Sequence, residues 1–106
     1  MHKILVLYPE PADRAAFEDY YVNKHLPIAA KLPGMKAARY SFGVSGLGDP
    51  GTGAPFFAVF EGDFDSQADL AAAVTSPEGQ ALLADVPNFA TGGAVVVKYP
   101  VETLIG

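Results

Sequence analysis

Three short segments of the chain are apolar at consecutive positions, so an extended strand made from any of them would be apolar on both faces. They are residues 4–8 (ILVLY), 56–60 (FFAVF) and 94–97 (AVVV). An antiparallel sheet with helices on one side usually alternates apolar and polar residues, because its other side meets water. Left bare, that side would exceed the roughly 300–600 Å² apolar patch of ordinary monomers. We therefore expect a second copy to cover it in a homodimer; the alternative is a small sheet that tolerates exposed aliphatic side chains.

Strand and helix patterns alternate along the chain in the order β-α-β-β-α-β. Strands are predicted over residues 3–8, 36–44, 56–62 and 94–101. This order predicts an α+β, ferredoxin-like fold with a four-stranded antiparallel sheet. The 106 residues form one domain, 1–106, with no room for a separate cofactor domain, and we expect no cofactor.

The first helical region carries a stripe of large side chains at helical spacing. Asp13 is suited to cap its N-terminus, and the stripe consists of Phe17, Tyr21, His25, Ile28 and Leu32. Pro27 has no N–H for the carbonyl of Asn23, so we expect a kink or restart there and an end at residues 33–34.

The second helical region has two start signals. Ser66 begins a capping signature, and Ser76 followed by Pro77 restarts the helix, which continues to Pro87. Between the second and third strands, residues 46–55 (GLGDPGTGAP) are glycine-rich, and we expect a mobile connection long enough to act as a lid.

Composition excludes several classes of function. The net charge is −5 with no basic cluster, which disfavours nucleic acid. The chain has no cysteine, and no histidine or acidic pair has metal-ligand spacing, so we expect no metal site. No apolar stretch approaches the ~20 residues of a membrane span. We expect a cytoplasmic protein that does not bind membranes.

His25 is the most informative side chain because it lies on the apolar stripe between Tyr21 and Ile28. Burial would keep its imidazole neutral and available as a base, whereas a helix C-terminus near Pro27 would favour the protonated form. The alternative is a structural histidine that binds the carbonyl of Asn23 or a tyrosine hydroxyl. His2, near the terminus, is the only other histidine.

Tyr40 shares a predicted strand face with Phe42, and its hydroxyl would approach His25 if that face meets the first helix. An aromatic pocket with few polar groups is typical of a small-molecule site. Its predicted walls are Phe17, Tyr21, Phe42 and Phe57, with Tyr20 as the weakest candidate. The alternative is an ordinary aromatic core. We expect Glu61 and Asp85 to be solvated or capping groups rather than acid catalysts.

Two segments resemble the EthD family. The first is Phe17-x-x-Tyr20-Tyr21-x-x-x-His25-x-Pro27-Ile28, followed by Leu32-Pro33-Gly34-Met35. The second is Ser76-Pro77-Glu78-Gly79-Gln80-Ala81, followed by Asp85-x-x-Asn88-Phe89. The resemblance covers most of the chain and implies a dimeric α/β barrel.

The family is named after the degradation of ethyl tert-butyl ether, and the resemblance implies an oxidoreductase link. Related barrels include a methylmuconolactone isomerase, aromatic polyketide enzymes without cofactors, and monooxygenases. In isomerase-like members, a histidine and a tyrosine at the positions of His25 and Tyr40 serve the pocket. A further histidine of some relatives is absent from residues 43–55, which argues against isomerase chemistry.

These observations lead to two hypotheses. In the first, the protein is a cofactor-independent enzyme or degradation accessory that acts on a small apolar or aromatic compound. His25 would then transfer or polarise a proton, and Tyr40 would be its hydrogen-bond partner. In the second, the same pocket belongs to a non-catalytic binding accessory protein.

Overall fold

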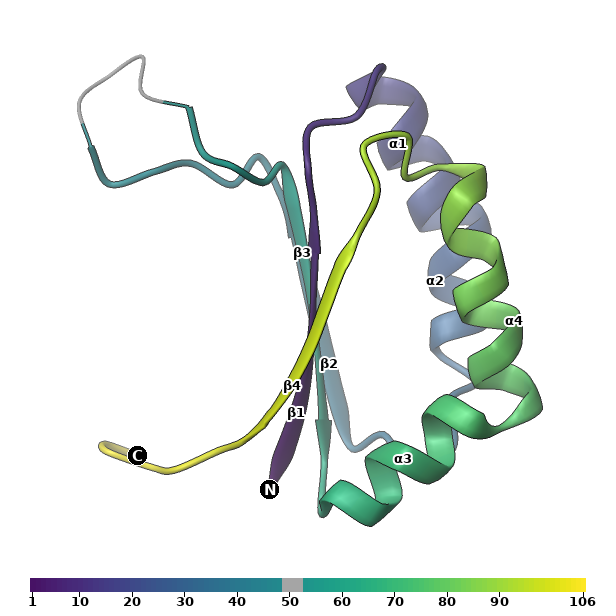
Figure 1. Ribbon diagram of the computed structural model, residues 1–106, viewed down its shortest axis with the longest axis vertical. Helices are drawn as coiled ribbons and strands as arrows, with labels where there is room; N and C mark the ends of the chain where they lie inside the picture. The colour runs from purple at the N-terminus through teal and green to yellow at the C-terminus, as the bar shows by residue number, and fades with distance from the viewer. Residues whose placement is uncertain (49–52) are drawn as a thin grey trace.

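The computed structural model describes residues 1–48 and 53–106. Helices cover one face of a sheet, and the other face is bare in the single chain (Figure 1). The elements in chain order are β1 (His2–Tyr8), α1 (Arg14–Tyr20), the π-helical turn η1 (Tyr21–His25), α2 (Leu26–Ala29), β2 (Ala37–Phe42), β3 (Ala58–Phe64), α3 (Gln67–Thr75), α4 (Pro77–Asp85), the short 3₁₀ turn η2 (Val86–Asn88) and β4 (Val95–Pro100).

The predicted α+β fold is confirmed. The four strands form one antiparallel sheet in the order β2-β3-β1-β4, so β1 and β3 are central and β2 and β4 are edges. The register pairs Val6 with Phe60 and with Val96, which places these three side chains on the same face. This is the face toward the helices.

A π-helical turn interrupts the first helical region where the sequence predicts a break. Asp13 caps α1 as expected, since its carboxylate accepts the backbone N–H of Ala16 at 3.0 Å. The N–H of Leu26 then bonds to the carbonyl of Tyr21, five residues back. This wider turn precedes Pro27, which lacks the N–H that a regular α-helix needs. The chain continues as α2, so His25 lies inside a helical segment rather than at a free C-terminus.

The second helical region divides at Ser76, as predicted. The Ser66 side chain caps α3, and the Ser76 hydroxyl accepts the N–H of Gly79 at 3.1 Å at the start of α4. Gly79 is required for close packing, because a Cβ there would lie 2.2 Å from the carbonyl oxygen of Ala73. The tight α3–α4 corner fixes the direction of α4, whose last residue is Asp85.

The core between sheet and helices is mainly aromatic. The ring of Phe17 stacks on Tyr21 at 5.5 Å and contacts Tyr8 edge-on at 5.4 Å. Such pairs add about 0.5–1.5 kcal/mol each to the effect of burial. The buried members of this cluster are Tyr8, Phe17, Tyr21, Ala29, Phe57, Ala58, Phe60, Phe89 and Ala90.

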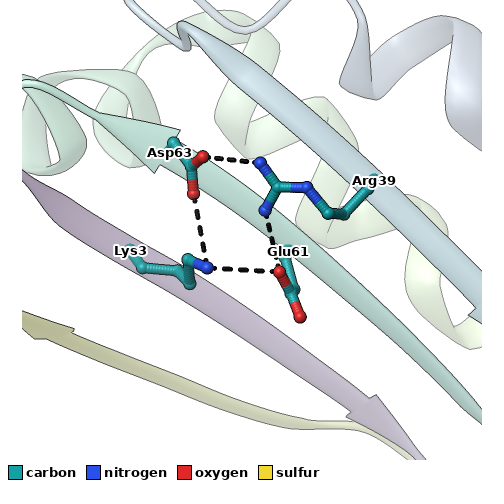
Figure 2. Close-up of polar contacts among 4 residues, drawn as sticks. All are labelled: Lys3, Arg39, Glu61 and Asp63. Carbon is teal, nitrogen blue, oxygen red and sulfur yellow. Dashed lines mark hydrogen bonds and ion pairs between the residues drawn. The ribbon is translucent and has the colours of Figure 1, made fainter. Parts of the chain in front are cut away.

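The outer face of the sheet carries a polar cluster as well as apolar side chains. Lys3, Arg39, Glu61 and Asp63, which we call the charge square, lie on three neighbouring strands with the helices behind the sheet (Figure 2). Arg39 donates to Glu61 at 2.8 Å and to Asp63 at 2.6 Å, while Lys3 donates to Glu61 at 3.2 Å. The expectation that Glu61 is simply solvated or capping is therefore wrong.

The rest of the outer face has the apolar character predicted for β1, β3 and β4. Val97 pairs in register with Leu5, and Val95 with Leu7. Val95 and Val97 are each about two-fifths exposed. The two-sided apolar pattern thus holds over one part of the sheet, while the charge square occupies the other.

Two segments extend from the sheet on the side opposite the helices (Figure 1). One is the β2–β3 connection, of which residues 49–52 lie outside the described part; the predicted lid spans residues 46–55 and so falls partly there. The other follows β4 and carries Leu104 and Ile105, which are almost fully exposed. Among the described residues, no helix combines the length and apolarity needed to cross a membrane.

Candidate functional site

Four polar side chains meet between the first helical region and the end of α4, and we call them the histidine cluster. Nδ1 of His25 lies 2.8 Å from one carboxylate oxygen of Asp85. The other oxygen of Asp85 accepts the Tyr20 hydroxyl at 2.7 Å and the Asn88 side-chain amide at 3.0 Å. His25 comes from η1, Tyr20 from α1, and Asp85 from α4. The cluster therefore joins the two helical regions of the fold.

Burial and hydrogen bonding set the protonation state of this cluster. Burial lowers the pKa of His25 from 6.5, although the Asp85 carboxylate acts in the opposite direction. Burial alone would raise the pKa of Asp85, but the hydrogen bonds from Tyr20, Asn88 and His25 together lower it. Near neutral pH, Asp85 is thus ionised and His25 is neutral with its proton on Nδ1. For this imidazole, burial outweighs the effect of the neighbouring carboxylate.

The imidazole of His25 packs against two aromatic rings that also contact each other. Its centroid lies 4.4 Å from that of Phe89 and 5.2 Å from that of Tyr21. Only 4% of its side chain is exposed. Because Asp85 binds Nδ1, the ring orientation is fixed and Nε2 is left without a hydrogen-bond partner among the residues that the structure describes.

A small apolar cavity of about 50 Å³ adjoins His25. Its lining is aliphatic and aromatic, apart from His25 and the hydroxyl of Tyr8. Burial raises the pKa of Tyr8 to about 12, so this phenol stays protonated. Next to Tyr8 lies Tyr21, whose buried hydroxyl has no hydrogen-bond partner within the described residues and whose pKa is also raised by burial.

The cavity adjoins a wider groove of about 410 Å³ beside β4, which we call the β4 groove. Four residues line both spaces, namely Ile4, Val74, Leu83 and Val96. The space beside His25 alone is smaller than ligand sites of roughly 300–1,000 Å³, whereas the groove has that size.

The sequence-predicted site residues occupy two different environments. Phe17, Tyr21 and Phe57 are buried in the aromatic core, while the Tyr40 side chain is 44% exposed. Tyr40 contacts Tyr21 at 5.9 Å between ring centroids, but no hydrogen bond joins it to His25 in the described part of the chain. Asp85 occupies the place that the sequence analysis gave to Tyr40 as the hydrogen-bond partner of His25.

The sequence did not reveal the role of Asp85. The expectation that Asp85 is a solvated or capping group is wrong, because its carboxylate binds Nδ1 of His25. Tyr20 was the weakest aromatic candidate in the sequence, because it points away from the helix face that carries Tyr21. The Tyr20 side chain instead points toward α4, where its hydroxyl binds Asp85. The pattern Asp85-x-x-Asn88 was the available signal, because it places an amide one helical turn after a carboxylate.

No group of three or more histidine, aspartate or glutamate side chains in residues 1–48 and 53–106 has an arrangement that could bind a metal ion.

The family model of the EthD domain matches residues 9–93. This span contains the whole histidine cluster and both motifs described above.

The chain is 36% identical to an uncharacterised 11.0 kDa protein of Rhodococcus erythropolis, encoded in the thcB–thcC intergenic region, over 99% of each chain. It is similar in structure to an EthD family protein of Bacillus halodurans, with a TM-score of 0.83, 27% identity, and coverage of 96% of this chain and 99% of that one. It shares its fold with a dimeric ferredoxin-like protein of Thermobifida fusca, of unknown function, at a TM-score of 0.66, 16% identity, and coverage of 94% and 90%. Together with the matching family model, the likeness over nearly the full length shows that this chain belongs to the EthD family.

Proposed function

We propose that the protein is a cofactor-independent enzyme that transfers a proton on a small apolar or aromatic compound. The observation that carries this proposal is the hydrogen bond between Asp85 and Nδ1 of His25, which turns the unpaired Nε2 into a base. An imidazole with a carboxylate behind it and a free second nitrogen is a common arrangement for general base catalysis. The cavity that adjoins His25 is lined almost entirely by apolar side chains, which suits an apolar substrate.

Each cluster residue has a distinct role in this proposal. His25 takes a proton from the substrate through Nε2, and Asp85 stabilises the imidazolium that forms. Tyr20 and Asn88 fix the carboxylate of Asp85, and the rings of Tyr21 and Phe89 fix the plane of His25. Phe17, Phe42 and Phe57 support this packing. A direct role for Tyr40, like the oxidoreductase link and the cytoplasmic location, stays a prediction.

The experiment uses 5-nitrobenzisoxazole, a small apolar aromatic compound that reports proton abstraction. A base removes the C3 proton, the ring N–O bond breaks, and 2-cyano-4-nitrophenolate forms without any further reactant. We expect His25→Asn to lower kcat/KM by roughly 100-fold, which is typical of the loss of a general base. In the wild type, the rate should rise with pH through a midpoint below 6.5 and then level off.

Two controls separate catalysis from folding. His2→Asn removes the other histidine and should leave the rate unchanged. Circular dichroism should show that His25→Asn remains folded. A folded His25→Asn variant with the wild-type rate would exclude His25 as the base.

A non-catalytic binding accessory is the second candidate, and the small volume beside His25 favours it. With only about 50 Å³ at the imidazole, a ligand in the β4 groove need not contact Nε2 at all. In that case, a ligand would change the imidazole signal of His25 little, and the proton-abstraction rate would not depend on this residue.

We further propose that two copies associate through the outer faces of their sheets. Support comes from the exposed Val95, Val97 and Tyr99, from the two segments that extend on that side (Figure 1), and from structural neighbours described as dimeric. Sedimentation equilibrium at micromolar concentration should give a dimer. A monomer under those conditions would contradict this assembly.

A further inference from the structure

Among the described residues that line the β4 groove, one side chain, Lys98, is charged, and it forms no ion pair with another described residue. Its lining is formed by Ile4, Leu70, Ala71, Val74, Thr75, Leu83, Val96, Val97 and Lys98, so that only Thr75 and Lys98 bring polar side chains. The Thr75 hydroxyl donates to the carbonyls of Ala71 and Ala72 at 2.9 and 3.3 Å. This leaves the ammonium of Lys98 as the available side-chain donor of the groove.

Lys98 differs from most other basic residues of the chain. Lys3, Arg14, Lys36 and Arg39 each form an ion pair with a carboxylate. In the part of the chain that the structure describes, only Lys24, Lys31 and Lys98 have none. Of these three, Lys98 alone lines the groove that adjoins the His25 cavity.

The register places Lys98 at one end of a continuous apolar track. Lys98 pairs with Ile4, and Val96 pairs with Val6, all on the face toward the helices. Val96 also lines the cavity beside His25. Two residues along a strand span about 7 Å, so a molecule that contacts Lys98 and follows Val96 inward is elongated.

Charge then defines the ligand further. The chain has a net charge of −5, so it repels anions in general. Lys98 is exposed at the edge of the groove, so its ammonium attracts an anion locally while the adjoining apolar walls contact an uncharged body. An anionic group at one end of an apolar body matches both features.

We propose that Lys98 selects ligands that carry one carboxylate at the end of an elongated aromatic or aliphatic body. The carboxylate binds the Lys98 ammonium at the mouth of the β4 groove, and the apolar body extends toward His25. This is a binding step in which no covalent bond changes. The inference rests on the proposed function, because it takes the β4 groove as the ligand site of that function.

The experiment compares matched pairs of probes that differ in charge. The pairs are 2-naphthoate with 2-naphthalenemethanol and decanoate with decanol, with binding measured by calorimetry. We expect the wild type to bind each acid roughly 10-fold or more tightly than its alcohol, as charged hydrogen bonds provide. Lys98→Met, which keeps the length of the side chain, should lose this preference by weakening acid binding only.

Lys31→Met is the matched control, because Lys31 is also unpaired in the described residues but lies outside the groove. It should retain the preference for acids. Equal affinity of the wild type for acids and alcohols would overturn the role of Lys98 and leave the groove as a ligand site. An equal loss of the acid preference in Lys98→Met and Lys31→Met would also overturn the role of Lys98, because the net charge of the protein would then explain the preference. If no probe binds the wild type, the groove fails as a ligand site and the inference fails with it, whereas the rate test of His25 still judges the proposed chemistry.

Discussion

The two polar clusters of this protein each contain an aspartate that accepts side-chain hydrogen bonds, but they differ in charge balance. In the charge square, two cations face two carboxylates, and every side chain has an opposite charge beside it (Figure 2). In the histidine cluster, three donors converge on the single carboxylate of Asp85, and one nitrogen of His25 has no partner in the described residues. In the charge square, even Oδ1 of Asp63, which accepts no hydrogen bond in the described residues, lies 3.7 Å from the Lys3 ammonium. The charges of that cluster therefore stabilise the sheet, whereas the histidine cluster keeps a neutral imidazole nitrogen that is able to accept a proton.

The pKa shifts show the same difference. Arg39 lowers the pKa values of Glu61 and Asp63, and Glu61 raises that of Lys3, so the charge square keeps its charges across the neutral range. The His25 imidazole has a lowered pKa for the opposite reason, because burial opposes its charge. Only the histidine cluster changes its proton content in mild acid.

The largest expected effect is that of Asp85→Ala. It removes the acceptor of the buried His25 Nδ1 and of the half-buried Tyr20 hydroxyl, and a buried donor without an acceptor is costly. We expect the free energy of unfolding to fall by about 2–3 kcal/mol in urea denaturation. Asp65→Ala, at an exposed residue, is the control and should change stability by less than about 0.5 kcal/mol. Equal losses of stability in the two variants would contradict the stabilising role of Asp85 as the acceptor of His25 and Tyr20.

Asp63→Ala should have a smaller effect, although Asp63 is as buried as Asp85. Lys3 and Arg39 keep Glu61 as a partner when Asp63 is removed, so neither cation is left alone. We expect a loss of about 1 kcal/mol, measured in urea at the same protein concentration as for Asp85→Ala. If Asp63→Ala lowered the free energy of unfolding more than Asp85→Ala does, the charge square would be the more sensitive of the two clusters, contrary to this prediction.

As pH falls, the histidine cluster should lose its stabilising effect first and the charge square second. The folded-state pKa of His25 lies below its unfolded value of 6.5, so its contribution is complete above pH 6.5 and is lost as pH falls through the folded pKa. The contributions of Glu61 and Asp63, whose pKa values are also lowered, are complete above pH 4.5 and are lost only at lower pH. Stability measured against pH should therefore begin to fall below 6.5, and His25→Asn should remove this first step.

The smallest expected effect is that of Glu61→Gln, because the Glu61 side chain is about one-third exposed. We expect a loss of less than about 1 kcal/mol at low salt, which should disappear in 1 M NaCl as ions screen the pairs. The difference between wild type and variant, measured in urea with and without salt, tests this. A loss that persists in 1 M NaCl would indicate a packing role for the side chain instead.

The fold was predictable from the sequence because its signals are local. Runs of consecutive apolar residues, proline positions and capping side chains located the strands and helix starts within a few residues. Ser76 followed by Pro77 predicted the α3–α4 corner, and Pro27 predicted the break that the π turn fills. None of these signals depends on contacts between distant parts of the chain.

The site was only half predictable, since its decisive contacts join residues far apart in sequence. His25 was found from its place on an apolar stripe, but Asp85 lies 60 positions away and its bond depends on how α4 packs. Likewise, Arg39 gave no sign that it would meet Glu61 and Asp63, because strand register decides which charges become neighbours.

The π turn gives the site tolerance to one change in chain length. The wide turn between Tyr21 and Leu26 contains one residue more than an α-helix would place there. Deletion of Asn23 would remove this extra residue, so Leu26 could still bond to Tyr21 and the helical segments on either side would keep their relative direction. A single in-frame codon loss at this turn would thus leave the imidazole facing its carboxylate, whereas the same loss inside a regular helix would rotate one side by about 100° relative to the other.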